Sequence, residues 1–260
     1  MDKIKGVLLD IDGVLYAGNK PVPGASDAIG FLKNNKIPFR CISNTTRKSK
    51  KSISEKLKSY GFDIPVEHIF TPASVVVSIL KENNVKNCFL LTWGDVRQDI
   101  LKDGITESIP GAGAVIVGDA GDNFDYSAMN QAFRLINDGA DFYALEKDKY
   151  WMDSDGLSLS AGPFVLGLEY ATGRSAVLVG KPSSSFFTKA LGSMNIRASE
   201  AIMVGDDIDS DVGGAQNIGV RGILVRTGKF NEERLKKSEI IPYRIIDSIG
   251  VLPEIIGNSN

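Results

Sequence analysis

Short apolar runs alternate with helical patterns along most of this chain, and this alternation restricts its fold more than any other feature. Residues 7–9 form the first run, which is too short for a helix and is typical of a buried strand. Apolar residues between 25 and 32 then recur at helical spacing, and a second strand-like run follows at 39–42. Strands and helices in this order are typical of a parallel sheet with helices on both faces. The sequence therefore predicts an α/β fold built on a doubly wound, Rossmann-like parallel sheet.

The same alternation begins again in the middle of the chain. Strand-like runs at 88–91, 114–117 and 142–145 alternate there with helical stretches. This block is long enough to bury a small core of its own, so we expect a separate α/β cap domain. The predicted domains are a first part of the core at 1–82, an inserted cap at 83–174 and a second part of the core at 175–260.

Two smaller features of the sequence carry local predictions. Gly18-Asn19 separates two short extended stretches, which predicts a hairpin over residues 16–22. Inside the cap, the glycines and serines of residues 153–164 predict a loop. For the neighbouring Trp151 two interpretations stay open, ordinary packing in the core or a contact with the substrate.

The composition excludes several classes of protein. The chain has 260 residues with 43% hydrophobic side chains and a net charge of −2, which gives no electrostatic case for binding nucleic acid. No apolar run reaches the length of a membrane span. The first hydrophobic segment contains Asp10 and Asp12, which a signal peptide would not tolerate. We therefore expect a soluble cytoplasmic protein that binds neither nucleic acid nor membrane.

The chain has few residues for zinc or thiol chemistry. Cys41 and Cys88 lie in strand-like apolar runs, where we expect buried free thiols rather than a disulfide. The single histidine, His68, excludes a site made of several histidines and does not lie beside a candidate nucleophile. The chemistry must therefore depend on carboxylates, a lysine and a metal ion.

Polar side chains follow four of the predicted strands. Because parallel strands end at one edge of a sheet, residues far apart in the sequence can meet there in one crevice. The acids suit Mg²⁺, and a lysine with hydroxyl and amide groups suits the oxygens of a phosphoryl group in transfer. The four groups are Asp10 and Asp12, Ser43 and Asn44, Lys181, and Asp206 with Asp207 and Asp211.

The order and spacing of these groups resemble the four motifs of the haloacid dehalogenase superfamily of phosphatases over essentially the whole chain. The long insertion before Gly180-Lys181-Pro182 resembles the type II-capped branch, which includes p-nitrophenyl phosphatase, pyridoxal phosphatase and NagD-like proteins. Residues 160–164 and 168–173 look closest to phospholysine phosphohistidine phosphatase-like members. Dehalogenases lack a second acid at the position of Asp12, so the resemblance is to the phosphatases.

The resemblance implies a Mg²⁺-dependent phosphatase that hydrolyses small phosphomonoesters through an aspartyl-phosphate intermediate. Asp10 would be the nucleophile and Asp12 the general acid and base. The carboxylates of Asp10 and Asp206 and the backbone carbonyl of Asp12 would hold Mg²⁺. Ser43, Asn44 and Lys181 would bind the phosphoryl oxygens, and Lys181 would also keep Asp10 ionised.

Several alternatives stay open on the sequence. A receiver-like signalling module also carries an acceptor aspartate and Mg²⁺, but it needs neither Asp12 nor a second α/β unit. A phosphomutase would differ only in how water is excluded, and a catalytically inactive binding protein would not need all four groups. For Asp207 and Asp211, direct metal ligation and a supporting role are both open. Some relatives associate through the cap, so a homo-oligomer is an expectation besides a small phosphorylated substrate.

Overall fold

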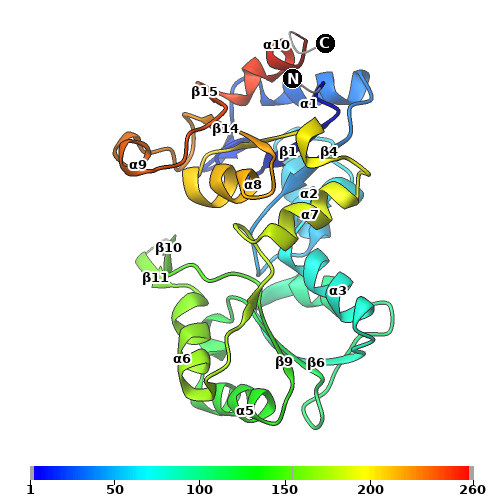
Figure 1. Cartoon of the computed structure of the whole chain (residues 1–260), viewed down its shortest axis with the longest axis vertical. Helices are drawn as coiled ribbons and strands as arrows, with labels where there is room; N and C mark the ends of the chain where they lie inside the picture. The colour runs from blue at the N-terminus through cyan, green and yellow to red at the C-terminus, as the bar shows by residue number, and fades with distance from the viewer. Residues whose placement is uncertain (1–2, 154, 258–260) are drawn as a thin grey trace. The chain divides into compact units, whose positions relative to one another are not determined.

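The computed structural model describes residues 3–153 and 155–257 (Figure 1). Its contacts divide the chain into two compact units. The first unit contains Met1–Ser43, Ile53–Phe70 and Lys181–Asn260, and the second contains Asn44–Ser52 and Thr71–Gly180. Ser154 of the predicted loop and the outermost residues of the predicted core, 1–2 and 258–260, lie outside the described residues.

A six-stranded sheet forms the centre of the first unit. Its strand order is β15-β14-β13-β1-β4-β5, and every pair of neighbours is parallel. The two central strands, β1 and β13, are buried throughout and apolar except for Asp10 at the end of β1, which is why they read as short continuous hydrophobic runs. The strands are β1 (Gly6–Asp10), β4 (Phe39–Ile42), β5 (Ile69–Phe70), β13 (Ala201–Gly205), β14 (Arg221–Val225) and β15 (Arg244–Ile246).

Helices lie on both faces of this sheet, so the prediction of a doubly wound parallel sheet is confirmed. Val7 and Leu9 of β1 share one core cluster with the buried sides of α1 (Ala25–Asn34), α2 (Lys50–Ser59) and α10 (Leu252–Gly257). On the other face, Leu224 packs with the π-helix η5 (Ile208–Gly213), and α7 (Ser184–Gly192) contacts β1. Because successive residues of a strand point to opposite faces, each strand serves both layers. The remaining helices are α8 (Gly214–Gln216) and α9 (Glu232–Lys237), with short 3₁₀ turns η1 (Val66–His68), η4 (Ala198–Glu200) and η6 (Ile249–Val251).

The predicted hairpin after the first strand is also present. Tyr16–Ala17 (β2) and Lys20–Pro21 (β3) pair in antiparallel orientation, and Gly18 adopts a positive φ of 58° in the turn.

The second unit has its own five-stranded parallel sheet in the order β12-β9-β8-β6-β7. Its core cluster joins the buried strand residues to the inner sides of α5 and α6. The strands are β6 (Asn87–Leu91), β7 (Thr106–Glu107), β8 (Ala114–Val117), β9 (Asp141–Ala144) and β12 (Val177–Leu178). The helices are α3 (Pro72–Glu82), α4 (Arg97–Ile100), α5 (Tyr126–Asn137) and α6 (Gly162–Thr172), with 3₁₀ turns η2 (Gly94–Val96) and η3 (Gly121–Asn123).

The contact division includes α3 and residues 44–52 in the second unit, whereas the sequence predicts the cap at 83–174. The predicted domain boundaries stay a prediction.

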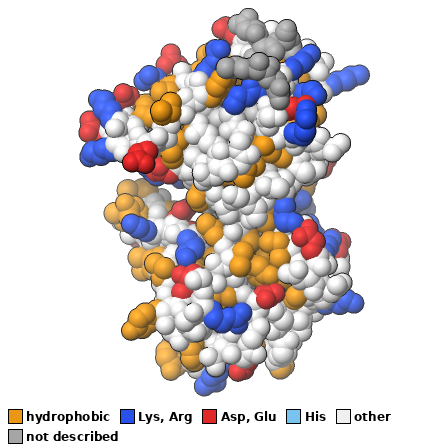
Figure 2. Space-filling view, viewed as in Figure 1, with side chains coloured by type: hydrophobic (Ala, Val, Ile, Leu, Met, Phe, Trp, Pro, Cys, Tyr) orange, Lys and Arg blue, Asp and Glu red, His pale blue; other side chains and the backbone are white. Residues whose placement is uncertain are grey.

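The prediction of a loop at residues 153–164 is wrong. Tyr150–Asp153 (β10) and Gly156–Leu159 (β11) form an antiparallel hairpin, and α6 begins at Gly162. In the second strand Leu157 and Leu159 alternate with Gly156 and Ser158. This period of two indicates a strand, although glycine and serine are typical of loops. The alternation leaves one face of the hairpin apolar and exposed, and Figure 2 shows hydrophobic side chains gathered there. The exposed side chains are Tyr150, Met152, Leu157 and Leu159.

Trp151 lies on the opposite face of the hairpin. Its ring is half-buried under the guanidinium of Arg47, whose Cζ lies 5.0 Å from the ring centroid. The two cysteines are buried free thiols, as expected. Among the described helices, none has the length and apolarity that crossing a membrane requires.

Candidate active site

Four charged side chains are buried together at the carboxyl edge of the first unit's sheet. Asp10 is the last residue of β1, and Asp206 directly follows β13, its neighbour in the sheet. Asp211 comes from η5 and Lys181 from the segment before α7. These four residues are between 1% and 7% exposed, although charged residues are almost never buried unless they are paired. Adjacent parallel strands thus bring together residues that lie almost 200 positions apart.

Lys181 lies at the centre of this cluster. Its Nζ donates to Oδ1 of Asp10 and to Oδ1 of Asp211, both at 2.6 Å. Burial works against the charge of Lys181, but the two carboxylates outweigh it and raise the pKa of the ammonium. Lys181 is therefore a permanent cation at this edge.

The cluster holds more negative than positive charge. Three carboxylates share one ammonium, and burial together with the charge of Asp211 raises the pKa of Asp206 to about 6. Burial likewise raises the pKa of Asp10 well above its usual range, although Lys181 opposes this. The site therefore lacks positive charge in the absence of a bound cation.

A divalent metal ion fits these donors. Asp10, Asp206 and Asp211 each offer a carboxylate oxygen, and the three oxygens lie within 4.8 Å of one another. Mg²⁺ prefers oxygen ligands and is commonly bound by one or two carboxylates. The sequence predicted Asp10, Asp12 and Asp206 as ligands, with Asp12 acting through its backbone carbonyl. The carboxylate cluster contains Asp211 and does not test that carbonyl, so the predicted ligand set stays a prediction.

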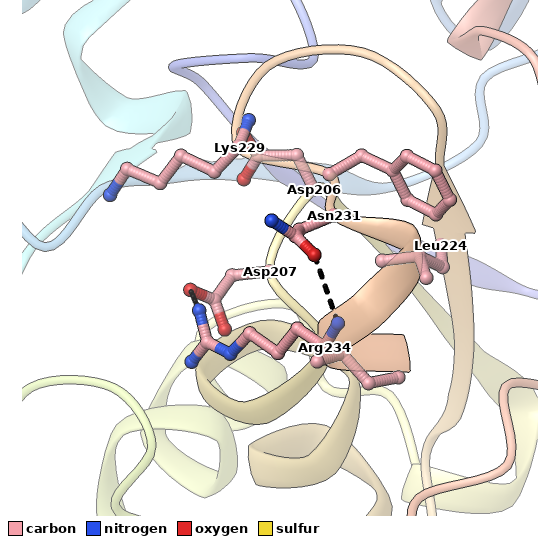
Figure 3. Close-up of a pocket in the computed structure, with 8 residues that line it drawn as sticks. Asp206, Asp207, Leu224, Lys229, Asn231 and Arg234 are labelled. Atoms are coloured by element: carbon pink, nitrogen blue, oxygen red, sulfur yellow. Dashed lines mark hydrogen bonds and ion pairs between the residues drawn. The ribbon is translucent and has the colours of Figure 1, made fainter. Parts of the chain in front are cut away.

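Asp207 points to a different partner. Its carboxylate accepts hydrogen bonds from the backbone N–H groups of Asp209 and Ser210, both at 2.9 Å, and pairs with Arg234 at 3.1 Å. Figure 3 shows Asp207 and Arg234 side by side at the pocket beside Asp206. Burial opposes the charge of Asp207, but the N–H donors and Arg234 outweigh it and lower the pKa. Of the two acids left open by the sequence, the structure ties Asp207 to η5 and Arg234, and Asp211 to Lys181.

Two glycines permit the close approach of backbone to Asp206. A Cβ on Gly13 would lie 1.9 Å from Oδ2 of Asp206, and one on Gly228 would lie 2.1 Å from the same oxygen. Both glycines also have positive φ, 83° and 63°, which disfavours other residues. The N–H of Lys229 donates to this oxygen at 2.6 Å. The segment after β14 therefore helps to hold Asp206. The sequence did not reveal this role, because the only local signal for it is a single glycine, Gly228.

Asp12 differs from the buried acids because its side chain is exposed. It lies two residues past the end of β1 and forms an isolated parallel bridge with Tyr16 at the start of the hairpin. An exposed carboxyl group at this edge is accessible to a substrate and to water, as a general acid and base must be.

The structure places Ser43 and Asn44 at the end of β4, directly after the last strand residue, Ile42. Ser43 is buried in the first unit, and its N–H donates to the carbonyl of Phe70 at 3.1 Å. Asn44 is counted with the second unit, where its Oδ1 lies 2.5 Å from the position of a Cβ on Gly180. Their roles in phosphate binding stay predictions.

The sequence matches known proteins of one family. Residues 7–106 match the family model described as haloacid dehalogenase-like hydrolase, and residues 178–252 match a related HAD-hydrolase-like model. The haloacid dehalogenase-like hydrolase domain-containing protein 2 of Homo sapiens is 41% identical over 247 residues, which cover 94% of this chain and 93% of that protein. This chain belongs to the haloacid dehalogenase-like hydrolase family.

Further similarities indicate the branch within the family. The phospholysine phosphohistidine inorganic pyrophosphate phosphatase of Homo sapiens is 36% identical, with 97% of this chain and 94% of that protein covered. The solved structure of NagD from E. coli K-12 superimposes with a TM-score of 0.88 at 26% identity, covering 95% of this chain and 98% of that one. The chain is thus a NagD-like enzyme of the phosphatase class, and the predicted family is confirmed. The sequence favoured the phospholysine phosphohistidine phosphatase-like members, and the hydrolase domain-containing protein 2 relatives show slightly higher identity.

Proposed function

We propose that this enzyme hydrolyses small phosphomonoesters with Mg²⁺ and forms an aspartyl-phosphate on Asp10. The observation that carries the proposal is the bridge of Lys181 between Asp10 and Asp211, inside a cluster of three buried carboxylates. A buried nucleophilic carboxylate, a fixed cation and acids that suit a metal ion are the groups that phosphoryl transfer requires.

In the first step, an oxygen of Asp10 attacks phosphorus, and the bond from phosphorus to the ester oxygen breaks. Lys181 stabilises the ionised form of Asp10 at 2.6 Å and offers positive charge to the phosphoryl oxygens. Asp12 gives its proton to the leaving oxygen.

In the second step, water attacks phosphorus of the aspartyl-phosphate. Asp12, now a carboxylate, takes a proton from that water as the bond between Asp10 and phosphorus breaks. Inorganic phosphate leaves, and both carboxyl groups return to their starting states.

Asp10, Asp206 and the carbonyl of Asp12 would hold Mg²⁺, and Asp211 is a further carboxylate within reach. When bound, the ion supplies the positive charge that the cluster lacks and polarises the phosphoryl group.

The other candidate functions differ in specific ways. A receiver-like module accepts a phosphoryl group but is not a hydrolase of esters, and membership of a family of hydrolases disfavours it. A phosphomutase would use the same acids and would return the phosphoryl group to a second substrate oxygen instead of to water. We propose that the second unit, which has its own sheet and core, acts as the cap that selects among substrates. The free buried thiols favour the reducing cytoplasm, where we place the protein.

The test is phosphate release from a panel of phosphorylated metabolites in the presence of Mg²⁺. The printed name of one relative adds phospholysine, phosphohistidine and pyrophosphate to the panel. We expect turnover of at least one phosphomonoester, and a phosphorylated Asp10 after rapid acid quenching. Exchange of the phosphoryl group between two hydroxyls without phosphate release would identify a phosphomutase. Phosphorylation of Asp10 without turnover of any ester would identify a receiver-like module.

A further inference from the structure

The segment at 227–234 lies between β14 and α9, includes the first turn of α9, and contacts two parts of the candidate active site. At its start, the hydroxyl of Thr227 donates to the carbonyl oxygen of Gly13 at 2.5 Å. Two residues later, the N–H of Lys229 donates to Oδ2 of Asp206 at 2.6 Å. This short segment therefore joins the turn after β1 to the acid that follows β13.

The backbone of the segment also encloses Asp206 closely. Gly13 and Gly228 lie so near Oδ2 of Asp206 that neither residue could carry a Cβ. The pocket that Asp206 lines with Lys229 and Asn231 has a cavity volume of only about 10 Å³ (Figure 3). The N–H of Lys229 therefore reaches the carboxylate from a fixed position. It sets the rotation of the carboxyl group and with it the direction of the oxygen left for a metal ion.

Arg234 anchors the far end of the segment to η5. Its Nε and Nη2 lie 2.8 and 2.5 Å from Oδ2 of Asp209, and its Nη1 donates to Oδ2 of Asp207 at 3.1 Å. Both acids lie at the start of η5, directly after Asp206. The planar guanidinium has several donors in a fixed fork, so it can hold two carboxylates at once. Asp209 takes two of these three contacts and is the main anchor.

The segment is also fixed inside itself and by apolar packing. The backbone N–H of Arg234 donates to Oδ1 of Asn231, which caps α9, at 2.9 Å (Figure 3). Phe230 packs against the small core cluster that contains Ile208 of η5 and Leu224 of β14. Thr227 at one end and Arg234 at the other thus hold a segment whose middle donates to Asp206.

We propose that Thr227 and Arg234 are positioning residues for Asp206, and that they set the affinity of the site for Mg²⁺ through the backbone N–H of Lys229. The inference rests on the proposed function, because it concerns the metal site of that reaction.

The physical reason is preorganisation. A carboxylate that is free to rotate loses this freedom when it binds a metal ion, whereas the Asp206 carboxylate has already lost it in the folded protein. Removal of a group that supports a metal ligand typically weakens metal binding by 10- to 100-fold. Thr227 and Arg234 act through one further residue, so we expect the lower end of this range.

The experiment measures Mg²⁺ binding by the full chain without substrate. Urea unfolding is followed with and without Mg²⁺, and the stability that Mg²⁺ adds gives its Kd for the folded protein. This comparison separates metal affinity from any loss of stability in the metal-free protein. For Arg234→Met, which keeps an apolar stem, and for Thr227→Val, which keeps the shape, we expect Mg²⁺ binding about 10-fold weaker.

Each variant has a matched control. Thr227→Ser keeps the hydroxyl and should keep the Mg²⁺ affinity of the unaltered protein. Arg244→Met makes the same change of charge as Arg234→Met. Arg244 is also exposed, but it lies in β15 with its guanidinium over the ring of Tyr243, at 5.8 Å. Its replacement should leave Mg²⁺ binding unchanged.

The outcomes separate positioning from simple support of the fold. If Arg234→Met and Thr227→Val lower the stability of the metal-free protein but keep the full stabilisation by Mg²⁺, the two residues only support the fold and the proposal is overturned. Equal weakening in Thr227→Ser and Thr227→Val would overturn the role of the hydroxyl, and equal weakening in Arg244→Met and Arg234→Met would overturn that of the Arg234 fork. If Mg²⁺ does not stabilise even the unaltered protein, the metal site of the proposed function fails.

Discussion

Lys181 donates to Asp10 across 171 positions of sequence, at 2.6 Å and in a site where both side chains are almost completely buried. The same ammonium donates to Asp211 at 2.6 Å. One cation therefore organises the nucleophile of the proposed reaction and an acid from the opposite end of the chain.

Asp10→Asn should reduce kcat by at least about 10³-fold, because it removes the nucleophile and a predicted metal ligand together. The fold should persist, since Lys181 keeps its second partner, Asp211. Phosphate release and circular dichroism of the purified variant check both parts. Near-normal turnover by the folded variant would contradict the mechanism.

Asp12→Asn should affect substrates unequally. We expect a loss of about 10²-fold for alkyl phosphates, which need a proton on the leaving oxygen, and a smaller loss for p-nitrophenyl phosphate. The measurement is kcat/KM for the two substrates, which excludes any limit set by the later hydrolysis of the intermediate. A uniform loss would argue that Asp12 serves binding instead of proton transfer.

Lys181→Met should lower both activity and stability. It leaves the buried carboxylates without their cation, and breaking a buried pair in this way costs about 3–5 kcal/mol. The loss of positive charge at the phosphoryl group should reduce kcat by about 10²-fold or more. Urea unfolding and steady-state kinetics measure the two effects. A surface lysine would show neither, so an unchanged variant would refute the site.

Mg²⁺ should raise the unfolding temperature of the enzyme and be required for activity, and a chelator should reverse both effects. Ca²⁺ should inhibit, because it prefers more ligands at longer distances. Asp206→Asn should abolish the thermal shift caused by Mg²⁺. Asp207→Asn is the matched control, since Asp207 is directed at Arg234 and η5, and it should retain the shift. A shift lost in both variants would assign Asp207 to the metal.

Glu200 should contribute a stability that depends on pH. It accepts hydrogen bonds from Arg197 at 2.7 and 2.9 Å and from Lys5 at 2.5 Å, and these lower its pKa from 4.5 to about 2. Because the folded-state pKa is depressed, the stabilisation is fully present above about pH 4.5 and declines as the pH falls toward 2. Glu200→Gln should therefore have a lower urea midpoint than the unaltered protein at pH 7, and the difference should shrink below pH 4.5.

The control for this prediction is Glu239→Gln. Glu239 is exposed, and it forms no ion pair with any of the residues that the structure describes. Its substitution should leave the midpoint unchanged at both pH values, and a pH-independent difference for Glu200→Gln would contradict the linkage.

The sequence by itself determined the class of fold and the edge at which the site lies. The apolar runs of β1 and β13 are continuous because parallel strands are buried on both faces, and the acids that follow them therefore had to meet at one edge. Local sequence also accounts for α5 (Tyr126–Asn137), because its buried positions lie on one helical face and the Asp125 side chain accepts from the N–H of Ala128 in its first turn.

Only the tertiary structure decided which partner each polar side chain takes. Asp207 and Asp211 are four residues apart and chemically identical, yet one pairs with Arg234 and the other with Lys181, because η5 directs them differently. The surroundings of the Tyr16 side chain are likewise tertiary, because its ring lies 4.9 Å from that of Tyr60 and Lys56 of α2 donates to its hydroxyl at 2.9 Å. Local periodicity indicates which residues of each segment are buried. Hydrogen bonds between distant segments depend instead on three-dimensional packing, which no local pattern encodes.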